Sequence, residues 1–217
     1  MNVLLVGQGN MGKILYSLLK DEVVLATNNF NDIDFNDNIN IDVIIDFSNR
    51  ENIPNIIKYS EIKKCKVIIA TTNLNEEDYN KLKELSNKTA VMIDSNYSYG
   101  IYILKKIIKE NILLFKDYDI ELIDIHHKYK LDAPSGTMKS IESIFKDNEL
   151  EYTVDVIRKG TIKGEHKVLL YGDEEYIEIN HVALSRKIFA NGAIKAARWI
   201  LTKEKGLFSF EDYILKK

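Results

Sequence analysis

The residues best suited to chemistry are concentrated between Glu121 and Thr137, in the segment ELIDIHHKYKLDAPSGT. This segment follows directly on an apolar, strand-like run and contains two of the chain's four histidines. Histidine gains and loses a proton near neutral pH, so His126 or His127 could deliver a proton to a substrate. Lys130 supplies a cation for a carboxylate or for developing negative charge. The sequence therefore predicts a proton-donating site that binds an anion.

The end of this segment, Pro134-Ser135-Gly136-Thr137, is typical of a loop that enters a helix. Backbone N–H groups at a helix N-terminus, here with the Thr137 hydroxyl, suit an anionic group. Each feature also has an ordinary structural explanation, namely solvated lysines, a helix cap and half-buried histidines. No metal is expected, because adjacent histidines lack the spaced ligand pattern of a zinc site.

A glycine-rich loop near the N-terminus predicts dinucleotide binding. Gly7, Gln8, Gly9, Asn10, Met11 and Gly12 form a G-x-G-x-x-G pattern between an expected strand and an expected helix. The acid that often follows about 20 residues later is missing, because the second strand ends in Ala26-Thr27-Asn28-Asn29. This removes repulsion against a 2′-phosphate, yet no Lys or Arg stands there to attract one. Both NADH and NADPH therefore remain candidate cofactors.

The elements that must position the glycine loop alternate between short apolar runs and amphipathic stretches. This alternation predicts βαβ units around a Rossmann-type parallel sheet. We expect strands at 3–6, 22–26, 41–47, 66–70 and 90–93, and helices after the glycines, up to about 60 and at 75–87.

The pattern changes after about Tyr97. A long amphipathic helix is expected at 101–115, followed by strands at 120–125, 154–158, 167–171 and 176–181 with one helix between the first two. Strands with few helices between them predict a second α+β domain with an open mixed sheet. The helix expected at 190–201 could pack back on the first domain. We therefore expect a dinucleotide-binding domain at 1–97 with 187–217, and a substrate-binding and oligomerisation domain at 98–186.

The composition excludes several classes of function. A net charge of −3 and a pI near 5.9 give no overall basis for binding nucleic acid or an anionic membrane. No apolar run approaches the roughly 18 to 20 residues that span a bilayer, and the first residues lack the pattern of a secretion signal. We expect a cytoplasmic protein in which the single cysteine, Cys65, is a buried or neutral spacer.

Taken together, these motifs resemble those of the bacterial dihydrodipicolinate reductase family. The ordered pattern E-x(4)-H-H-x-x-K-x-D-x-P-S-G-T is the most specific of them. Further similar motifs are Asp46-Phe47-Ser48, Ala70-Thr71-Thr72, Ser95 to Gly100, Arg158-Lys159-Gly160, Gly164 to Val168, and His181 to Ala193. The similarity extends over nearly the whole chain.

The resemblance implies NAD(P)H-dependent reduction of 4-hydroxy-tetrahydrodipicolinate to tetrahydrodipicolinate, in diaminopimelate and lysine biosynthesis, by a homotetramer assembled through the second-domain sheet. It implies that His126 donates the proton and that Lys130 is a second catalytic, carboxylate-binding cation. His127, Gly136 and Thr137 would bind the small dicarboxylate substrate. The cofactor would be lined by Gly7, Gln8, Gly9, Asn10, Met11, Gly12, Ala70, Thr71, Thr72, Asp94, Ser95, Asn96 and Tyr97.

The chain departs from the family pattern in its nucleotide half. Asn10 stands where the family usually has arginine, Ala70 replaces a glycine, Ser95 stands where alanine or proline is commoner, and the chain is short. Two other functions stay open from the residues alone. One is a different dicarboxylate or imine reductase on the same scaffold, and the other is a regulator that senses a dinucleotide without turning it over.

Overall fold

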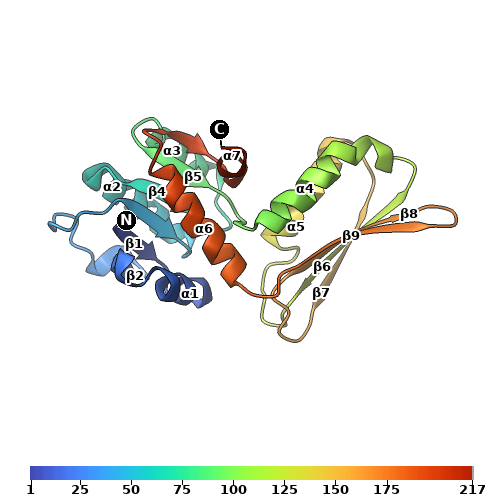
Figure 1. The fold of residues 1–217 in the computed structure, drawn as a ribbon, viewed down its shortest axis with the longest axis horizontal. Coiled ribbons are helices and arrows are strands. Elements are labelled where there is room, and N and C mark those ends of the chain that lie inside the picture. Colours follow the sequence, from blue (N-terminus) through green and yellow to red (C-terminus); the bar gives the residue numbers. More distant parts are fainter. Residues whose placement is uncertain (217) are drawn as a thin grey trace. The chain divides into compact units, whose positions relative to one another are not determined.

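The chain forms two compact units, shown in the computed structural model of Figure 1. One unit comprises Met1–Tyr97 and the chain from Lys187 onward, and the other comprises Ser98–Arg186. The structure describes residues 1–216, with Asp32 described by its backbone alone. Lys217, the last residue of the expected dinucleotide-binding domain, lies outside the described residues.

The first unit is built on a six-stranded parallel sheet, which confirms the predicted Rossmann-type architecture. The strand order is β10-β5-β4-β3-β1-β2. The strands are β1 Val3–Val6, β2 Val23–Thr27, β3 Val43–Asp46, β4 Lys66–Ile69, β5 Ala90–Ile93 and β10 Gly206–Phe208. Strands β1 and β3 are buried along their whole length, as expected where helices cover both faces of a parallel sheet.

Helices cover both faces of this sheet. They are α1 Asn10–Leu19, α2 Ile53–Lys63, α3 Glu76–Leu85, α6 Lys187–Ile200 and α7 Phe210–Leu215. Helix α6 packs into one of the two cores through four fully buried alanines, Ala190, Ala193, Ala196 and Ala197. Small side chains at these four positions let the helix approach the sheet closely. The expected last helix therefore does pack on the first unit.

Two features of the first unit were not predicted. Strand β10 and helix α7 are short, and three residues carry too little periodicity to reveal a strand. The connection from β2 to β3 contains only one helical turn among its described residues, η2 Phe30–Asp32.

The second unit is a four-stranded mixed sheet, as predicted, and its two helices lie on one face of this sheet (Figure 1). Its strands are β6 Asp119–His126, β7 Thr153–Arg158, β8 Glu165–Tyr171 and β9 Tyr176–Val182, in the order β7-β6-β8-β9. Strands β6 and β7 are parallel, and the other pairs are antiparallel. Helices α4 Tyr99–Asn111 and α5 Gly136–Asp147 bury their apolar stripes on the sheet. The helix expected at 101–115 corresponds to α4 and to the 3₁₀ segment that follows it, η4 Ile112–Phe115.

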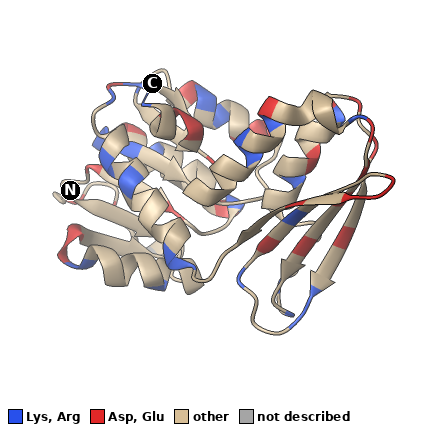
Figure 2. Cartoon of the chain, turned by 45° about the vertical axis from the view of Figure 1, so that its right-hand side comes forward, with Lys and Arg blue, Asp and Glu red and all other residues tan. Residues whose placement is uncertain are grey.

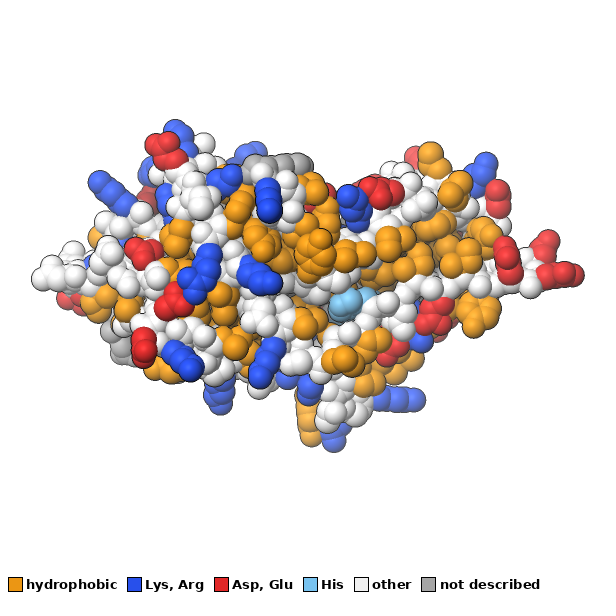
Figure 3. Space-filling view, viewed as in Figure 1, with side chains coloured by type: hydrophobic (Ala, Val, Ile, Leu, Met, Phe, Trp, Pro, Cys, Tyr) orange, Lys and Arg blue, Asp and Glu red, His pale blue; other side chains and the backbone are white. Residues whose placement is uncertain are grey.

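The surface carries charges of both signs in mixed positions (Figures 2 and 3). On the face shown in Figure 3, lysine and arginine side chains alternate with acidic ones and with apolar atoms. Within residues 1–216, no helix has the length and apolar character needed to cross a bilayer.

Candidate active site

The predicted proton donor lies at the end of β6, on the face that packs against the helices. Alternate residues of β6 are buried, and this row runs from Ile120 and Leu122 to Asp124 and His126. Asp124 has no exposed surface, and His126 is 7% exposed. The row therefore changes from apolar to polar where the strand ends, and it leaves two chemically active side chains at the edge of a core.

Asp124 is the centre of a compact charge cluster. Its Oδ2 accepts hydrogen bonds from the Ser135 backbone N–H at 2.8 Å and from the Arg158 guanidinium at 2.9 Å. Its Oδ1 accepts one from the Ser135 hydroxyl at 2.8 Å and lies 3.1 Å from His126 Nδ1. Burial alone would raise the pKa of Asp124, but these donors lower it by more than burial raises it. The pKa of Asp124 therefore lies well below the usual range. Asp124 is therefore an ionised carboxylate inside the unit.

Two more histidines extend this cluster across the sheet. The strand register places His166 of β8 opposite Asp124, and His181 of β9 opposite His166. The His166 ring lies edge-on to the His126 ring, with centroids 5.2 Å apart. Burial lowers the pKa of His166 to about 3, despite the nearby Asp124 carboxylate. His166 is consequently neutral near pH 7 and adds bulk rather than charge.

The cluster contains three groups of the types that bind metals. Ligand atoms of Asp124, His126 and His166 lie within 4.8 Å of one another. However, the Arg158 guanidinium is 2.9 Å from Asp124 Oδ2, and a divalent cation there would be repelled by it. We therefore interpret the cluster as a means of placing protons and charge.

Helix α5 begins beside this cluster, at the predicted anion-binding turn. Ser135 is its N-cap, and its Oγ accepts a hydrogen bond from the Met138 N–H at 3.2 Å. The first two helical residues, Gly136 and Thr137, are the predicted substrate-binding pair. Arg158 also donates to the Asp132 carbonyl at 2.8 Å, which holds the loop before α5 against β7.

Lys130 is already paired with a carboxylate. Its Nζ lies 2.7 Å from Asp132 Oδ1. Both this ammonium and the Gly136 N–H lower the pKa of Asp132, although burial acts against them. An internal carboxylate thus contacts the cation and the amide that were predicted to hold a substrate carboxylate.

The surroundings of His127 are positively charged. Its pKa is lowered by burial and by the charges of Arg186, His126, Lys130 and Lys163. An anion entering this region would meet several cations and the N-terminus of a helix, both of which are favourable. The predicted group of His126, His127, Lys130, Gly136 and Thr137 therefore lies within one connected region of the second unit.

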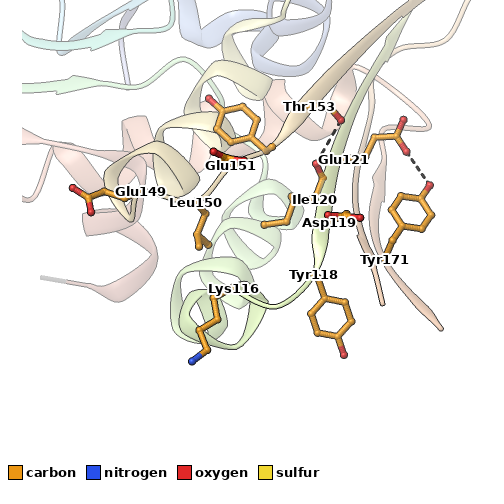
Figure 4. Close-up of a pocket in the computed structure, with 11 residues that line it drawn as sticks. Lys116, Tyr118, Asp119, Ile120, Glu121, Glu149, Leu150, Glu151, Thr153 and Tyr171 are labelled. Carbon is orange, nitrogen blue, oxygen red and sulfur yellow. Dashed lines mark hydrogen bonds between the residues drawn. The ribbon is translucent and has the colours of Figure 1, made fainter. Parts of the chain in front are cut away.

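A separate hollow in this unit is unsuited to an anionic substrate. It has a volume of about 670 Å³ and lies where β6 begins, about 23 Å along the strand from His126 at the usual rise per residue. Its lining includes four carboxylates, Asp119, Glu121, Glu149 and Glu151. Figure 4 shows Glu121 hydrogen-bonded to the Tyr171 hydroxyl, at 2.9 Å. We exclude this hollow as the dicarboxylate site because like charges would repel the ligand.

The glycine loop of the first unit has the shape required to hold a pyrophosphate. Gly7 has a φ of +95°, and a Cβ there would lie 2.6 Å from the Phe47 carbonyl oxygen. A Cβ on Gly12 would overlap the Gly7 backbone, so the loop and α1 can pack only with glycine there. Gly9 differs, because no atom lies within 4 Å of the position of its Cβ. Gly9 precedes α1 directly, so an anion has open space beside the helix N-terminus.

Two buried polar atoms lie at the carboxyl ends of β3 and β4. Asp46 Oδ2 and the Thr71 hydroxyl are buried, and neither makes a well-aligned hydrogen bond in the described part of the chain. Burial raises the pKa of Asp46 to about 6, and polar contacts from Ser48 and from the nearby Thr71 hydroxyl limit the rise. Nucleotides bind at this edge of open α/β sheets, so these atoms suit the polar end of a bound nicotinamide.

The remaining predicted cofactor residues follow β4 and β5. Ala70, Thr71 and Thr72 come directly after β4, and Asp94, Ser95, Asn96 and Tyr97 come directly after β5. The Tyr97 side chain is a core residue, 1% exposed, and its hydroxyl donates to the Ile69 carbonyl. The Asp94 carboxylate accepts from the Phe210 N–H at the start of α7. These two side chains hold the loop in place.

Asn28 stands where many dinucleotide folds have an acidic residue. Its side-chain carbonyl accepts a hydrogen bond from the Gln8 N–H at 2.8 Å, which ties the end of β2 to the glycine loop. Asn52 donates to the Asn28 carbonyl at 3.0 Å from the start of α2. An amide at this place neither repels a 2′-phosphate nor attracts it as a cation would.

Sequence reasoning gave no role to Asp124, Arg158, His166 or Gly164. A signal for Asp124 was present, because it shares the buried face of β6 with Leu122 and His126 and is charged. The other three residues come from β7, β8 and the loop before β8, and their approach depends on strand pairing. A Cβ on Gly164 would lie 3.1 Å from His126 Nε2, so a larger residue would crowd this ring.

Comparisons with known proteins agree along both units. The sequence profile described as dihydrodipicolinate reductase, N-terminus, matches residues 23–97, and the profile of its C-terminus matches residues 100–214. A 4-hydroxy-tetrahydrodipicolinate reductase of Brachyspira hyodysenteriae is 36% identical over 99% of this chain and 100% of its own length. That of Staphylococcus carnosus is 37% identical over 98% of this chain and 99% of its own.

Among solved structures, the fold is similar to that of a dipicolinate-bound dihydrodipicolinate reductase from Paenisporosarcina sp. TG-14. The TM-score is 0.74 at 19% identity, and the match covers 96% of this chain and 97% of that one. At this identity the likeness supports the fold.

Proposed function

Because this chain belongs to the dihydrodipicolinate reductase family, we propose that it reduces 4-hydroxy-tetrahydrodipicolinate to tetrahydrodipicolinate with NADH or NADPH. One hydride and one proton are added, and the 4-hydroxyl leaves as water. This reaction belongs to diaminopimelate and lysine biosynthesis. The observation that carries the proposal is the convergence of His126, Lys130 and the α5 N-terminus in a positively charged region of the second unit.

We assign the proton transfer to His126. Its Nδ1 faces the ionised Asp124, so Nε2 is the nitrogen that remains for the substrate. When bound, the reduced nicotinamide supplies the hydride to a conjugated unsaturated bond. His126 supplies the proton, and a positioned acid of this kind contributes roughly 10² to 10⁴ in rate.

The substrate carboxylates are assigned to the cationic side of the same region. Lys130, His127 and the N–H groups of Gly136 and Thr137 would hold them. Charge-assisted hydrogen bonds to carboxylates are about twice as strong as neutral ones, and this protein has an overall negative charge of −3. Local cations are therefore needed to bind a dianion.

The first unit is proposed to hold the cofactor. The open space at Gly9 fits the pyrophosphate, and Asp46 with Thr71 offers polar atoms to the nicotinamide end. Asn10 and Asn28 supply no cation for a 2′-phosphate, and no carboxylate stands at either place to repel one. We propose that the cofactor is NADH or NADPH and that the reaction takes place in the cytoplasm.

We also propose that four copies assemble through the second-unit sheet. The helices α4 and α5 cover one face of this sheet, and the other face carries the partly exposed Tyr171, Tyr176 and Val182. Apolar side chains on an uncovered sheet face favour association. Light scattering after gel filtration should give the mass of a tetramer, and the mass of a monomer would contradict this assembly.

Steady-state kinetics with freshly prepared substrate test the proposed reaction. Oxidation of NADH and of NADPH is followed for the wild type, His126→Gln, Lys130→Ala and the neighbouring control Lys128→Ala. We expect the two site variants to lose at least 10²-fold in turnover, with the control unchanged. Near-wild-type rates for His126→Gln would refute its role, and nucleotide binding without any turnover would favour a sensing regulator.

A further inference from the structure

We infer that Asp124 is a positioning residue that fixes the tautomer of His126, with one proton held on Nδ1 and the other, transferable proton on Nε2. This inference rests on the proposed function, in which His126 is the proton donor. It assigns a task to a carboxylate that the proposed reaction does not otherwise use.

Hydrogen-bond donors fix the orientation of the Asp124 carboxylate. Its Oδ2 is held by the Ser135 backbone N–H at 2.8 Å and the Arg158 guanidinium at 2.9 Å. Neither group can accept a hydrogen bond, so this oxygen must remain an acceptor. The carboxylate cannot turn over without losing both bonds, and its other oxygen is therefore fixed in place.

His126 Nδ1 lies beside the Asp124 carboxylate. This nitrogen is buried, and it makes no aligned hydrogen bond within the described residues. Asp124 Oδ1 is 3.1 Å away and already accepts from the Ser135 hydroxyl. An ionised carboxylate only accepts, so an imidazole nitrogen beside it is satisfied when it carries a hydrogen. The Nδ1–H tautomer is the form that this pocket stabilises.

The Nδ1–H tautomer favours proton donation from Nε2. A cationic His126 that gives up its Nε2 proton becomes the Nδ1–H tautomer, which is the form that Asp124 stabilises. With the opposite tautomer, Nε2 carries the hydrogen of a neutral imidazole, which is a far weaker acid. A carboxylate that orients a catalytic histidine works on the same principle in hydrolytic triads.

The neighbouring groups do not provide an alternative partner. His166 Nε2 lies 3.5 Å from Asp124 Oδ1, and burial keeps this histidine neutral near pH 7. Arg158 contacts the opposite carboxylate oxygen, Oδ2. The His126 ring is bordered by His166 on one side and by Gly164 near Nε2. Asp124 is therefore the group that determines which ring nitrogen is protonated.

Asp124→Asn provides a specific test because it keeps the shape and removes the charge. The amide oxygen must face the N–H donors of Ser135 and Arg158, which places the NH₂ group toward His126. His126 Nδ1 must then accept a hydrogen bond, and the proton moves to Nε2. The variant thus forces the opposite tautomer without removing the imidazole.

The tautomer is measured on the whole protein by NMR of ring nitrogens in ¹⁵N-histidine-labelled samples at a pH where His126 is neutral. The His126 signals are assigned from their loss in His126→Gln. We expect the Nδ1–H form in the wild type and the Nε2–H form in Asp124→Asn. An Nε2–H form in the wild type would overturn the inference even if no Asp124 variant folds, and it would do so independently of any activity.

Kinetics and cofactor binding separate positioning from general structural damage. For Asp124→Asn we expect turnover to fall by about 10²- to 10⁴-fold with KM changed little, because the carboxylate acts through His126. The affinity for NADH should stay within about twofold of wild type, because the glycine loop lies in the other unit. Asp155→Asn, an exposed carboxylate on β7, is the matched control and should behave as wild type. A normal turnover number in Asp124→Asn, with the tautomer switched, would refute the positioning role.

Discussion

Replacement of Asp46 by asparagine should stabilise the first unit, and more strongly as the pH rises. Asp46 has no exposed surface, and its Oδ2 makes no well-aligned hydrogen bond within the described residues. Burial raises its pKa from 3.8 to about 6. The folded state therefore holds the proton to a higher pH than the unfolded state. The protonated carboxyl stabilises the folded state relative to the ionised one, and this contribution to the unfolding free energy is lost as the pH rises through about 6. Above that pH the folded state bears the full free-energy cost of burying an ionised carboxylate.

The magnitude follows from the difference between the two pKa values. A change from 3.8 to about 6 corresponds to about 3 kcal/mol of free energy once the carboxylate is ionised. About half of this penalty has developed at pH 5. Asparagine is neutral at every pH and can still accept from Ser48. The gain in unfolding free energy from Asp46→Asn should therefore be about 1 kcal/mol larger at pH 8 than at pH 5.

Urea unfolding followed by tryptophan fluorescence measures the unfolding free energy of the first unit. Trp199 is the chain's single tryptophan, and it packs against Phe208 and Tyr213 in the first unit. The exposed Asp21→Asn serves as the charge control and should show no such dependence on pH. An effect of Asp46→Asn that is equal at pH 5 and pH 8, or a loss of stability that grows with pH, would refute the reasoning.

Three further variants test the glycine loop of the first unit and the candidate site of the second unit. Gly9→Ala should fold normally, because its Cβ meets open space, yet lower NADH affinity by more than tenfold in calorimetry; unchanged affinity would remove the pyrophosphate from this place. Gly164→Ala should lower turnover more than it changes KM, because the added Cβ would lie 3.1 Å from His126 Nε2. Steady-state kinetics that show an unchanged turnover number would contradict this. Asp132→Asn should tighten binding of dipicolinate, used as a planar dicarboxylate probe, by up to about fivefold, because it releases Lys130; weaker binding in calorimetry would show that Asp132 orients Lys130 instead.

Much of the architecture could be predicted from periodicity alone. The apolar runs at β1 and β5 were placed with the bounds that the structure gives them, Val3–Val6 and Ala90–Ile93. Both strands are buried and bounded by loops, so their local sequence is sufficient to identify them. Strand β10 is different, because Gly206–Phe208 becomes a strand by pairing with β5, which is more than a hundred residues away in the sequence.

Part of the candidate site could likewise be predicted from one local segment, and the rest depends on the pairing of distant strands. His126, Lys130 and Gly136 lie in one continuous segment, so their grouping could be read from the order of residues. Arg158 and His166 join Asp124 through the pairing of β6 with β7 and β8. A sequence gives residue types along the chain but not strand register between distant segments. The position of Asp124 beside His126 was therefore visible only as a charge on an apolar face.

The most direct test of the account is a mass balance for the proposed reaction. The wild-type protein is mixed with freshly prepared 4-hydroxy-tetrahydrodipicolinate and NADH that carries deuterium in place of both hydrogens at the nicotinamide C4 position, and the product is analysed by mass spectrometry. We predict one tetrahydrodipicolinate for each NAD⁺ formed, with deuterium carried into the product, and no such product from His126→Gln at the same rate. NADH binding without product, or product without transferred deuterium, would contradict the proposal that this protein is the reductase.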